Sequence, residues 1–260
     1  RAIGIAYASK LYRNVPELQG EIAEKFSKQG NEVCFSTIGD ASTSEGMFLE
    51  CINAAGVLQI PLVMAVWDDG YGISVPKNFQ TTKGSISSAL KGFQKQADTN
   101  GIHIYKVKAW DYAGMCEVFE AGIEKIRNTH TPALFHVEEV TQPQGHSTSG
   151  SHERYKTPER LAWEKEWDCI KKMREWMQET NIATAQELDE IEKEATDYVN
   201  QAKKQAWEAY LAPLKKDIAT CIQYLNAIDH PSAAEAVKTL QSTKDAIRKD
   251  IGMAINQVLI

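Results

Sequence analysis

The sequence has few cysteines, no long apolar run and no excess of positive charge. Its five cysteines lie far apart among 260 residues, without paired spacing. That pattern favours free thiols in a reducing compartment over a disulfide framework or a zinc site. No apolar run approaches the ~18–20 residues that a membrane span needs. A net charge of −6 argues against a nucleic-acid binder, which usually carries a basic face.

Glycine is almost absent from the second part of the chain. Fifteen of the 16 glycines precede residue 156, and only Gly252 follows it. Charged residues number 31 in the first 155 positions and 33 in the last 105. We therefore predict an α/β domain over residues 1–155 and a helical region over residues 156–260. Because the sequence opens at Arg1, without a secretory segment, we also expect it to begin inside a longer chain.

In the first region, apolar runs of strand length alternate with stripes of helical spacing. Strands that alternate with helices imply a parallel sheet covered on both faces. The predicted fold class is therefore α/β, with a doubly wound, mostly parallel sheet. The expected strands are Val33–Ile38, Pro61–Trp67, Ile102–Val107 and Ala133–Val137, and the expected helices are Ala2–Leu11, Phe48–Leu58 and Met115–Ile126.

The second region has the start and stop signals of helices. Thr157 precedes a proline, which is typical of a first helical turn. The capping-box pattern, with glutamate three residues later, occurs at Thr184 and at Ser232. Pro213 and Pro231 are expected to divide the apolar stripes. We predict three or four packed helices.

The end of the first predicted strand is the most informative segment. Asp40 follows the strand, and Ser42 and Glu45 have capping-box spacing, so we expect a helix to begin at Ser42 or just after. A helix N-terminus beyond the carboxyl end of a parallel strand is a phosphate site. The usual nucleotide motifs are absent. A divalent cation is therefore expected to neutralise a phosphate beside Asp40.

A second acid follows the next strand. Asp69 lies 29 residues after Asp40 (69 − 40), with one strand–helix–strand unit between them. Neighbouring parallel strands would bring both carboxylates to one edge of the sheet. Magnesium binds few protein oxygens and completes its octahedron with phosphate and water. Either acid alone is more simply explained as a turn residue. The pair at consecutive strand ends favours the metal.

These segments resemble a known family, the α subunits of thiamin-diphosphate-dependent 2-oxo acid dehydrogenases. Gly39–Gly46 and Asp69–Ser74 resemble the two halves of the thiamin diphosphate motif, G-D-G followed by N-N. Gly145–Ser149 resembles the G-H-S-x-S loop of the same enzymes. The resemblance covers residues 1 to about 180. It implies the thiamin-diphosphate-binding fold and the cofactors thiamin diphosphate and Mg²⁺.

The resemblance assigns roles to individual residues. Asp40, Asp69 and the backbone carbonyl of Tyr71 would hold the metal, and His146 would be the catalytic residue at the mouth of the site. Ser147 matches the serine that is phosphorylated in mitochondrial relatives. The cofactor-binding positions implied are Gly39, Ala41, Ser42, Asp69, Gly70, Ile73 and His146.

The chain departs from the family pattern at several positions. Aspartates occupy both asparagine positions, and Ala41 replaces a glycine. Trp67 and Gln142 stand where relatives have arginines that contact the diphosphate. One acid is therefore added and two cations are missing.

The resemblance implies oxidative decarboxylation of a 2-oxo acid with acyl transfer to a lipoyl group. A branched-chain substrate of the 2-oxoisovalerate type is favoured. The alternatives are a pyruvate or acetoin dehydrogenase α subunit, or a non-catalytic assembly module. The implied partners are a β subunit, or the β half of a fused chain, and a lipoyl-bearing acyltransferase, in a homodimer or heterotetramer. We expect this chain alone to be inactive, and its location to be the bacterial cytoplasm or the mitochondrial matrix.

Overall fold

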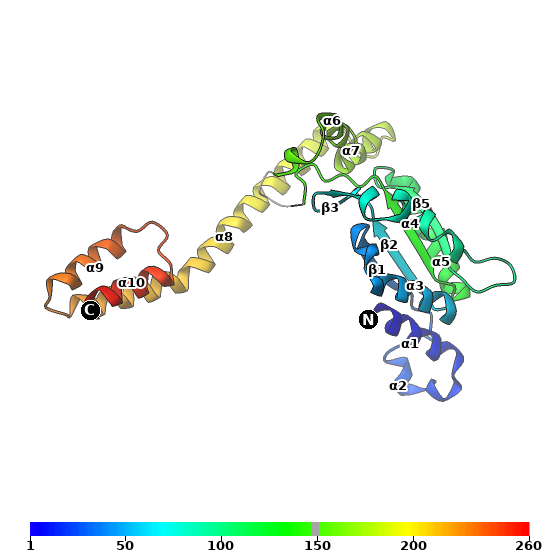
Figure 1. Ribbon diagram of the computed structural model, residues 1–260, viewed down its shortest axis with the longest axis horizontal. Coiled ribbons are helices and arrows are strands. Elements are labelled where there is room, and N and C mark those ends of the chain that lie inside the picture. The colour runs from blue at the N-terminus through cyan, green and yellow to red at the C-terminus, as the bar shows by residue number, and fades with distance from the viewer. Residues whose placement is uncertain (147–150, 260) are drawn as a thin grey trace. The chain divides into compact units, whose positions relative to one another are not determined.

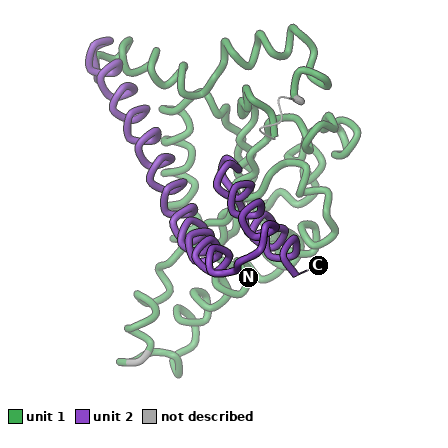
Figure 2. Tube along the Cα trace, turned by 90° about the vertical axis from the view of Figure 1, so that its left-hand side faces the viewer, with its two compact units in different colours: residues 1–182 green, residues 183–260 purple. Residues whose placement is uncertain are grey.

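The computed structural model describes residues 1–146 and 151–259, which fall into two compact units, Arg1–Ile182 and Ala183–Ile260 (Figure 2). The predicted boundary near Lys156 falls inside the first unit, because α6 (Pro158–Glu166) and α7 (Cys169–Glu179) belong to it. None of the helices in the described ranges combines the length and the apolar composition of a membrane span.

A four-stranded parallel sheet forms the centre of the first unit (Figure 1). Its strands, in spatial order, are β1 (Cys34–Gly39), β2 (Leu62–Trp67), β6 (Ala133–Glu138) and β5 (His103–Lys108). Every neighbouring pair is parallel, so the carboxyl ends of all four strands lie at one edge. The predicted α/β class and the parallel sheet are confirmed.

Helices cover both faces of this sheet (Figure 1). The helices α1 (Ala2–Asn14) and α3 (Gly46–Leu58) lie on one face, and α5 (Tyr112–Thr129) lies on the other. Successive strand residues point to opposite faces. Accordingly, Met64 packs in a cluster with α1 and α3, whereas Val63 packs in a cluster with α5.

Short elements connect these layers. A two-stranded antiparallel sheet, β3 (Tyr71–Gly72) with β4 (Val75–Pro76), follows β2 closely. It leads into a 3₁₀ turn over Lys77–Phe79 and then to the short helix α4 (Ile86–Ala89). A second short helix, α2 (Glu21–Glu24), lies between α1 and β1. The β3–β4 hairpin begins at Tyr71, two residues after Asp69, at the edge of the sheet where the predicted site lies.

The predicted helix start at Ser42 is wrong. A 3₁₀ turn occupies Ala41–Ser44, and α3 begins only at Gly46, after an extended Glu45. The Asp40 carbonyl accepts hydrogen bonds from the Thr43 backbone N–H (3.1 Å) and from the Thr43 hydroxyl (2.5 Å). These bonds close the chain into a tight turn before the helix starts. Neither turn nor helix has a side-chain cap.

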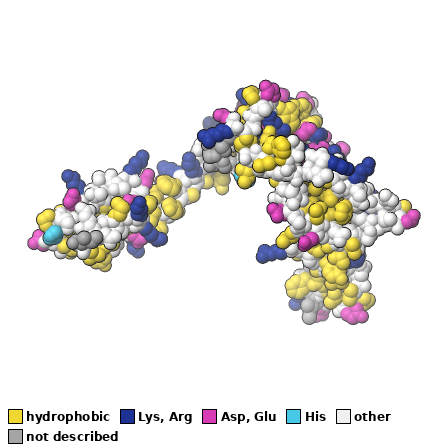
Figure 3. Space-filling model, in the orientation of Figure 1, with side chains coloured by type: hydrophobic (Ala, Val, Ile, Leu, Met, Phe, Trp, Pro, Cys, Tyr) yellow, Lys and Arg dark blue, Asp and Glu magenta, His cyan; other side chains and the backbone are white. Residues whose placement is uncertain are grey.

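The second unit consists of α8 (Ala185–Asn226), α9 (Pro231–Ser242) and α10 (Arg248–Leu259). Its apolar core is formed by the three helices and lies over the second half of α8. The part of α8 before Leu211 exposes large apolar side chains (Figure 3), among them Ile191, Tyr198, Trp207 and Tyr210.

Helix boundaries in the second region agree with the sequence only in part. Thr184 forms the predicted capping box, and Thr157 caps α6 as expected. The other predicted box is wrong, because α9 begins at Pro231 with His230 as its cap. Pro213 does not end a helix either. It lies inside α8, where buried leucines on both sides of it, Leu211 and Leu214, hold the helix together at the cost of one backbone hydrogen bond.

Five helices, α6 to α10, therefore lie in the described part of the region after Lys156, where we predicted three or four.

Candidate functional site

A cleft of about 770 Å³ opens at the carboxyl ends of the central strands. Eight of the nine residues expected at the site line it: Gly39, Asp40, Ala41, Ser42, Asp69, Tyr71, Ile73 and His146. The ninth, Gly70, is the residue between Asp69 and Tyr71. Residues from three segments, after β1, after β2 and after β6, thus meet at one cleft.

The register of the sheet explains this convergence. The Asp40 N–H donates to the Trp67 carbonyl at 3.1 Å, and the Asp68 N–H donates to the Val137 carbonyl at 2.9 Å. The three strands therefore end at nearly the same level. Because each chain leaves the sheet there, the acids that follow β1 and β2 come together, as the sequence predicted.

Asp40 is a buried acid with an unused acceptor. The residue is 5% exposed, and its Oδ2 has no hydrogen-bond partner among the described residues. Burial, together with the negative charges of Asp68 and Asp69, raises the pKa of Asp40 to about 7. A buried carboxylate oxygen without a partner is costly. A cation in the cleft would supply the missing partner.

Asp69 shapes the turn that follows β2. Its Oδ1 accepts the Tyr71 N–H at 3.0 Å, and its backbone carbonyl accepts Arg160 Nη2 at 2.8 Å. Gly70 lies between them with φ +85°, a conformation that glycine adopts without strain. Burial raises the pKa of Asp69 above its ordinary value. The turn therefore presents a second acid to the cleft, and the carboxylate also serves the turn itself.

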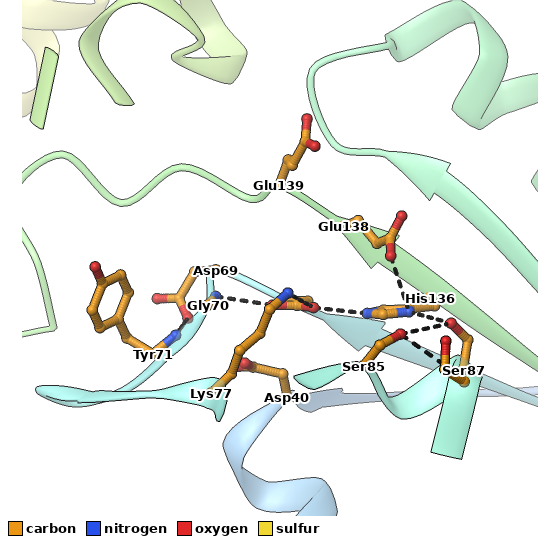
Figure 4. A network of polar contacts seen from close by, with 12 residues as sticks. Asp40, Asp69, Gly70, Tyr71, Lys77, Ser85, Ser87, His136, Glu138 and Glu139 are labelled. Atoms are coloured by element: carbon orange, nitrogen blue, oxygen red, sulfur yellow. Dashed lines mark hydrogen bonds and ion pairs between the residues drawn. The ribbon is translucent and has the colours of Figure 1, made fainter. Parts of the chain in front are cut away.

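Asp68 forms a buried hydrogen-bond network that the sequence did not reveal, and its partners Lys77, Gly70 and His136 are labelled in Figure 4. Its side chain is 2% exposed, and its Oδ2 accepts Lys77 Nζ at 2.7 Å and lies 2.8 Å from His136 Nε2. Its Oδ1 accepts the Gly70 N–H at 2.9 Å. The His136 ring continues through Nδ1 to the Ser87 hydroxyl, also at 2.8 Å. Although burial acts in the opposite direction, the hydrogen bonds from His136 and Lys77 lower the pKa of Asp68 to about 2.

No pattern in the sequence indicates this network. Lys77, Ser87 and His136 lie on three separate elements, and only the fold brings Lys77 and His136 to Asp68 and Ser87 to His136. Asp68, one of the two aspartates that the resemblance matches to asparagines, is therefore engaged in this network. Asp69, the other one, lines the cleft.

A close backbone approach shapes one wall of the cleft. A Cβ atom at Gly72 would lie 2.2 Å from Gln80 Nε2 and 2.8 Å from Ala41 Cβ, so only glycine fits. Gln80 lines the cleft, and its Oε1 is buried without a partner among the described residues. Gln80 was missed from sequence because its position depends on this contact. Next to it, Ile73 adopts φ +59°, which is unusual for a β-branched residue.

His146 is exposed and lines the cleft, with Thr141 and Gln142 from the same loop. Ser147, matched above to a phosphorylated serine, lies outside the described residues. Trp67 and Gln142, which the resemblance matches to two arginines, both line the cleft. No cation replaces them at the surface of the cleft, since its lining in the described ranges contains neither lysine nor arginine.

The donor set fits a magnesium ion bound together with a phosphate ligand. In the described ranges, no three His, Cys, Asp or Glu side chains converge as a metal cage would require. Three acidic residues nevertheless line one cleft, Asp40, Glu45 and Asp69, together with Gln80, whose amide oxygen has no partner among the described residues. Magnesium commonly takes one or two carboxylates and completes its shell with phosphate oxygens and water.

The chain belongs to the family described as the dehydrogenase E1 component, which it matches over residues 1–214. The match includes the whole sheet and the cleft. This family membership agrees with the resemblance carried by the residues after β1, β2 and β6.

Its relatives are named as α subunits. The chain is 26% identical over 180 residues to a pyruvate dehydrogenase E1 component subunit alpha from Rickettsia bellii, covering 69% of this chain and 52% of the relative. It is 28% identical over 212 residues to a chloroplastic subunit alpha-3 of the same enzyme from rice, Oryza sativa subsp. japonica (82% and 46%). It is 26% identical over 200 residues to the alpha subunit of an acetoin:2,6-dichlorophenolindophenol oxidoreductase from Cupriavidus necator (76% and 57%). The chain thus spans about half the length of these relatives.

Proposed function

We propose that this chain supplies the metal and diphosphate half of a thiamin diphosphate site in a 2-oxo acid dehydrogenase. The observation that carries the proposal is the buried Oδ2 of Asp40, which has no hydrogen-bond partner among the residues that the structure describes and lies in a cleft at the carboxyl ends of parallel strands. Membership of the dehydrogenase E1 component family supports it. A cation held by Asp40 would give this oxygen its partner and favour the ionised carboxylate.

Six residues that line the cleft then have a proposed role. Asp40, Asp69 and the Tyr71 carbonyl would hold Mg²⁺, and the backbone of Ala41 and Ser42 would face the diphosphate. Thiamin diphosphate supplies the electron sink that decarboxylation of a 2-oxo acid requires. His146 is exposed and lines the cleft, where its imidazole would face a bound substrate.

The substrate class proposed is pyruvate or an acetoin-type compound. The relatives described above carry pyruvate dehydrogenase and acetoin names, and they give the branched-chain preference expected from the sequence no support. A β subunit, or a β half of the same chain, would complete the site. Acyl transfer to a lipoyl-bearing partner is part of the same proposal.

The test is a calorimetric titration of the chain with thiamin diphosphate, with and without Mg²⁺, alone and with a cognate β subunit. We expect binding that requires Mg²⁺ and is lost in Asp40→Asn. The matched control is Asp98→Asn, which removes the same charge from an exposed aspartate outside the cleft. Formation of the complex with β, without any cofactor binding, would refute the proposal and favour the assembly module.

A further inference from the structure

A buried carboxylate on α6 holds two cations beside the cleft. Glu164 is 1% exposed, and its Oε2 and Oε1 accept Lys156 Nζ and Arg160 Nε, each at 2.8 Å. The Lys156 side chain is 2% exposed and that of Arg160 is 27% exposed. We name these three residues the Glu164 cluster. Buried ion pairs are often no more stable than apolar residues of the same volume, so stability alone does not account for the cluster.

Each cation of the cluster also contacts a loop that lines the cleft. Lys156 Nζ donates to the Gln142 carbonyl at 3.1 Å, on the loop after β6. Arg160 Nη2 donates to the Asp69 carbonyl at 2.8 Å, in the turn after β2. The planar fork of arginine makes it possible to bond a carboxylate and a carbonyl at once. The cluster therefore ties two walls of the cleft to one helix.

The same cations lie over aromatic rings. The Arg160 guanidinium carbon is 5.4 Å from the centre of the Tyr71 ring and 4.7 Å from that of Trp163. Lys156 Nζ is 5.2 Å from the Tyr71 ring. Arg160 thus contacts the Asp69–Tyr71 turn both at its backbone and at the ring of Tyr71. Trp163 lies against the same guanidinium group.

The charge of the cluster is also suited to this place. Two cations and one carboxylate leave a net charge of +1 behind the turn, while the acidic residues Asp40, Glu45 and Asp69 line the cleft. The positions where the family places two arginines, Trp67 and Gln142, carry no charge. The cluster contacts the backbone of one of these positions, Gln142, from behind.

We propose that Lys156 and Arg160 are positioning residues that, held by Glu164, set the Asp69–Tyr71 turn for a divalent cation and couple it to the loop after β6. This inference rests on the proposed function, since it assigns residues to the same metal site. It adds a set of cations that act from behind the cleft and need not touch the diphosphate.

The test is the affinity for Mg²⁺ alone, measured by calorimetry on the whole chain. We expect Arg160→Gln to weaken Mg²⁺ binding about 10- to 100-fold, the usual loss when a residue that orients a metal ligand is removed. Arg160→Lys keeps the charge and loses the fork, so its loss should be smaller. Lys165→Gln removes a charge from an exposed residue of the same helix and should leave the affinity unchanged.

A spectroscopic signal separates this role from simple stabilisation. Mg²⁺ should change the fluorescence of Trp163, because the cation on its ring is tied to the metal turn. If Trp163→Phe abolishes the fluorescence change, the signal comes from Trp163. Arg160→Gln should also abolish it. A folded Arg160→Gln or Arg160→Lys chain with wild-type Mg²⁺ affinity would overturn the inference while the proposed function stands. A wild-type chain that binds neither Mg²⁺ nor thiamin diphosphate would overturn both.

Discussion

His136 Nε2 lies 2.8 Å from Asp68 Oδ2, with 0% and 2% of the two side chains exposed. Lys77 Nζ is the other side-chain partner of this oxygen in the described part of the chain. Asp68 in turn holds the Gly70 N–H. The pair therefore lies between the core of the sheet and the turn that leads into the cleft.

We expect His136→Leu to destabilise the fold by about 3 to 5 kcal/mol, the usual loss when one partner of a buried pair is removed. Asp68 would remain buried with fewer hydrogen bonds. Chemical denaturation measures the loss. His103→Leu is the matched control, because His103 is half-buried on the neighbouring strand β5, outside this network. Equal losses in both variants would show that the ring matters only for packing.

Gly72→Ala should destabilise the fold by about 1 to 3 kcal/mol, as overpacking usually does, and disturb the cleft. The added Cβ would overlap the Gln80 side chain, which can move, and Ala41 Cβ, which is part of the turn after β1. Gly46→Ala is the control, since a Cβ there meets no described atom within 4 Å. Thermal unfolding measures the loss of stability, and titration with thiamin diphosphate measures the effect on the cleft. Unchanged values for Gly72→Ala would contradict the close approach.

Asp69→Asn should tighten diphosphate binding at low Mg²⁺. Asparagine keeps the acceptor for the Tyr71 N–H, so the turn should survive, while one negative charge beside Asp40 is lost. Like charges a few ångströms apart cost about 1 to 4 kcal/mol at the effective dielectrics of water to protein surface. Calorimetry across a series of Mg²⁺ concentrations measures the change. Loss of binding would show that the metal needs the charge, and equal affinity throughout would make Asp69 a turn residue only.

His130 should make the fold sensitive to mild acid. Burial lowers the pKa of His130 below its ordinary value of 6.5. A depressed pKa means that the folded chain favours the neutral ring. The stabilisation is therefore present above pH 6.5 and is lost as the pH falls through the folded pKa. His130 has φ +53°, a conformation that asparagine tolerates.

We expect the unfolding free energy of the wild type to fall between pH 7.5 and pH 5 more steeply than that of His130→Asn. Denaturation at several pH values measures the two slopes. Parallel slopes would mean that the buried ring does not titrate in this range.

The sequence was informative where local chemistry sets the structure. Apolar runs fixed the strands within a few residues, and parallel pairing then brought Asp40 and Asp69 to one edge. The start of α3 was missed because a 3₁₀ turn stabilised by Thr43 competes with a helix there. Pro213 was misjudged because packing on both sides outweighs its local penalty.

The parts of the site that could not be predicted depend on tertiary contacts. Nothing in the sequence distinguishes Asp68 from Asp69, yet one faces His136 and Lys77 and the other lines the cleft. Glu164 reads as an ordinary helix glutamate until the fold buries it between Lys156 and Arg160. Pairings between distant segments of this kind have no periodicity by which a single sequence could reveal them.

Ile73 has a strained backbone conformation at the surface of the cleft. A β-branched side chain at φ +59° costs of order 1–3 kcal/mol, and the residue is 62% exposed, so burial does not offset the strain. In a library of variants screened for folding alone, position 73 should drift toward glycine or asparagine. A screen that also demands cofactor binding should retain isoleucine, because the side chain lines the cleft. The frequencies at this one position would then report what the chain has been selected to do.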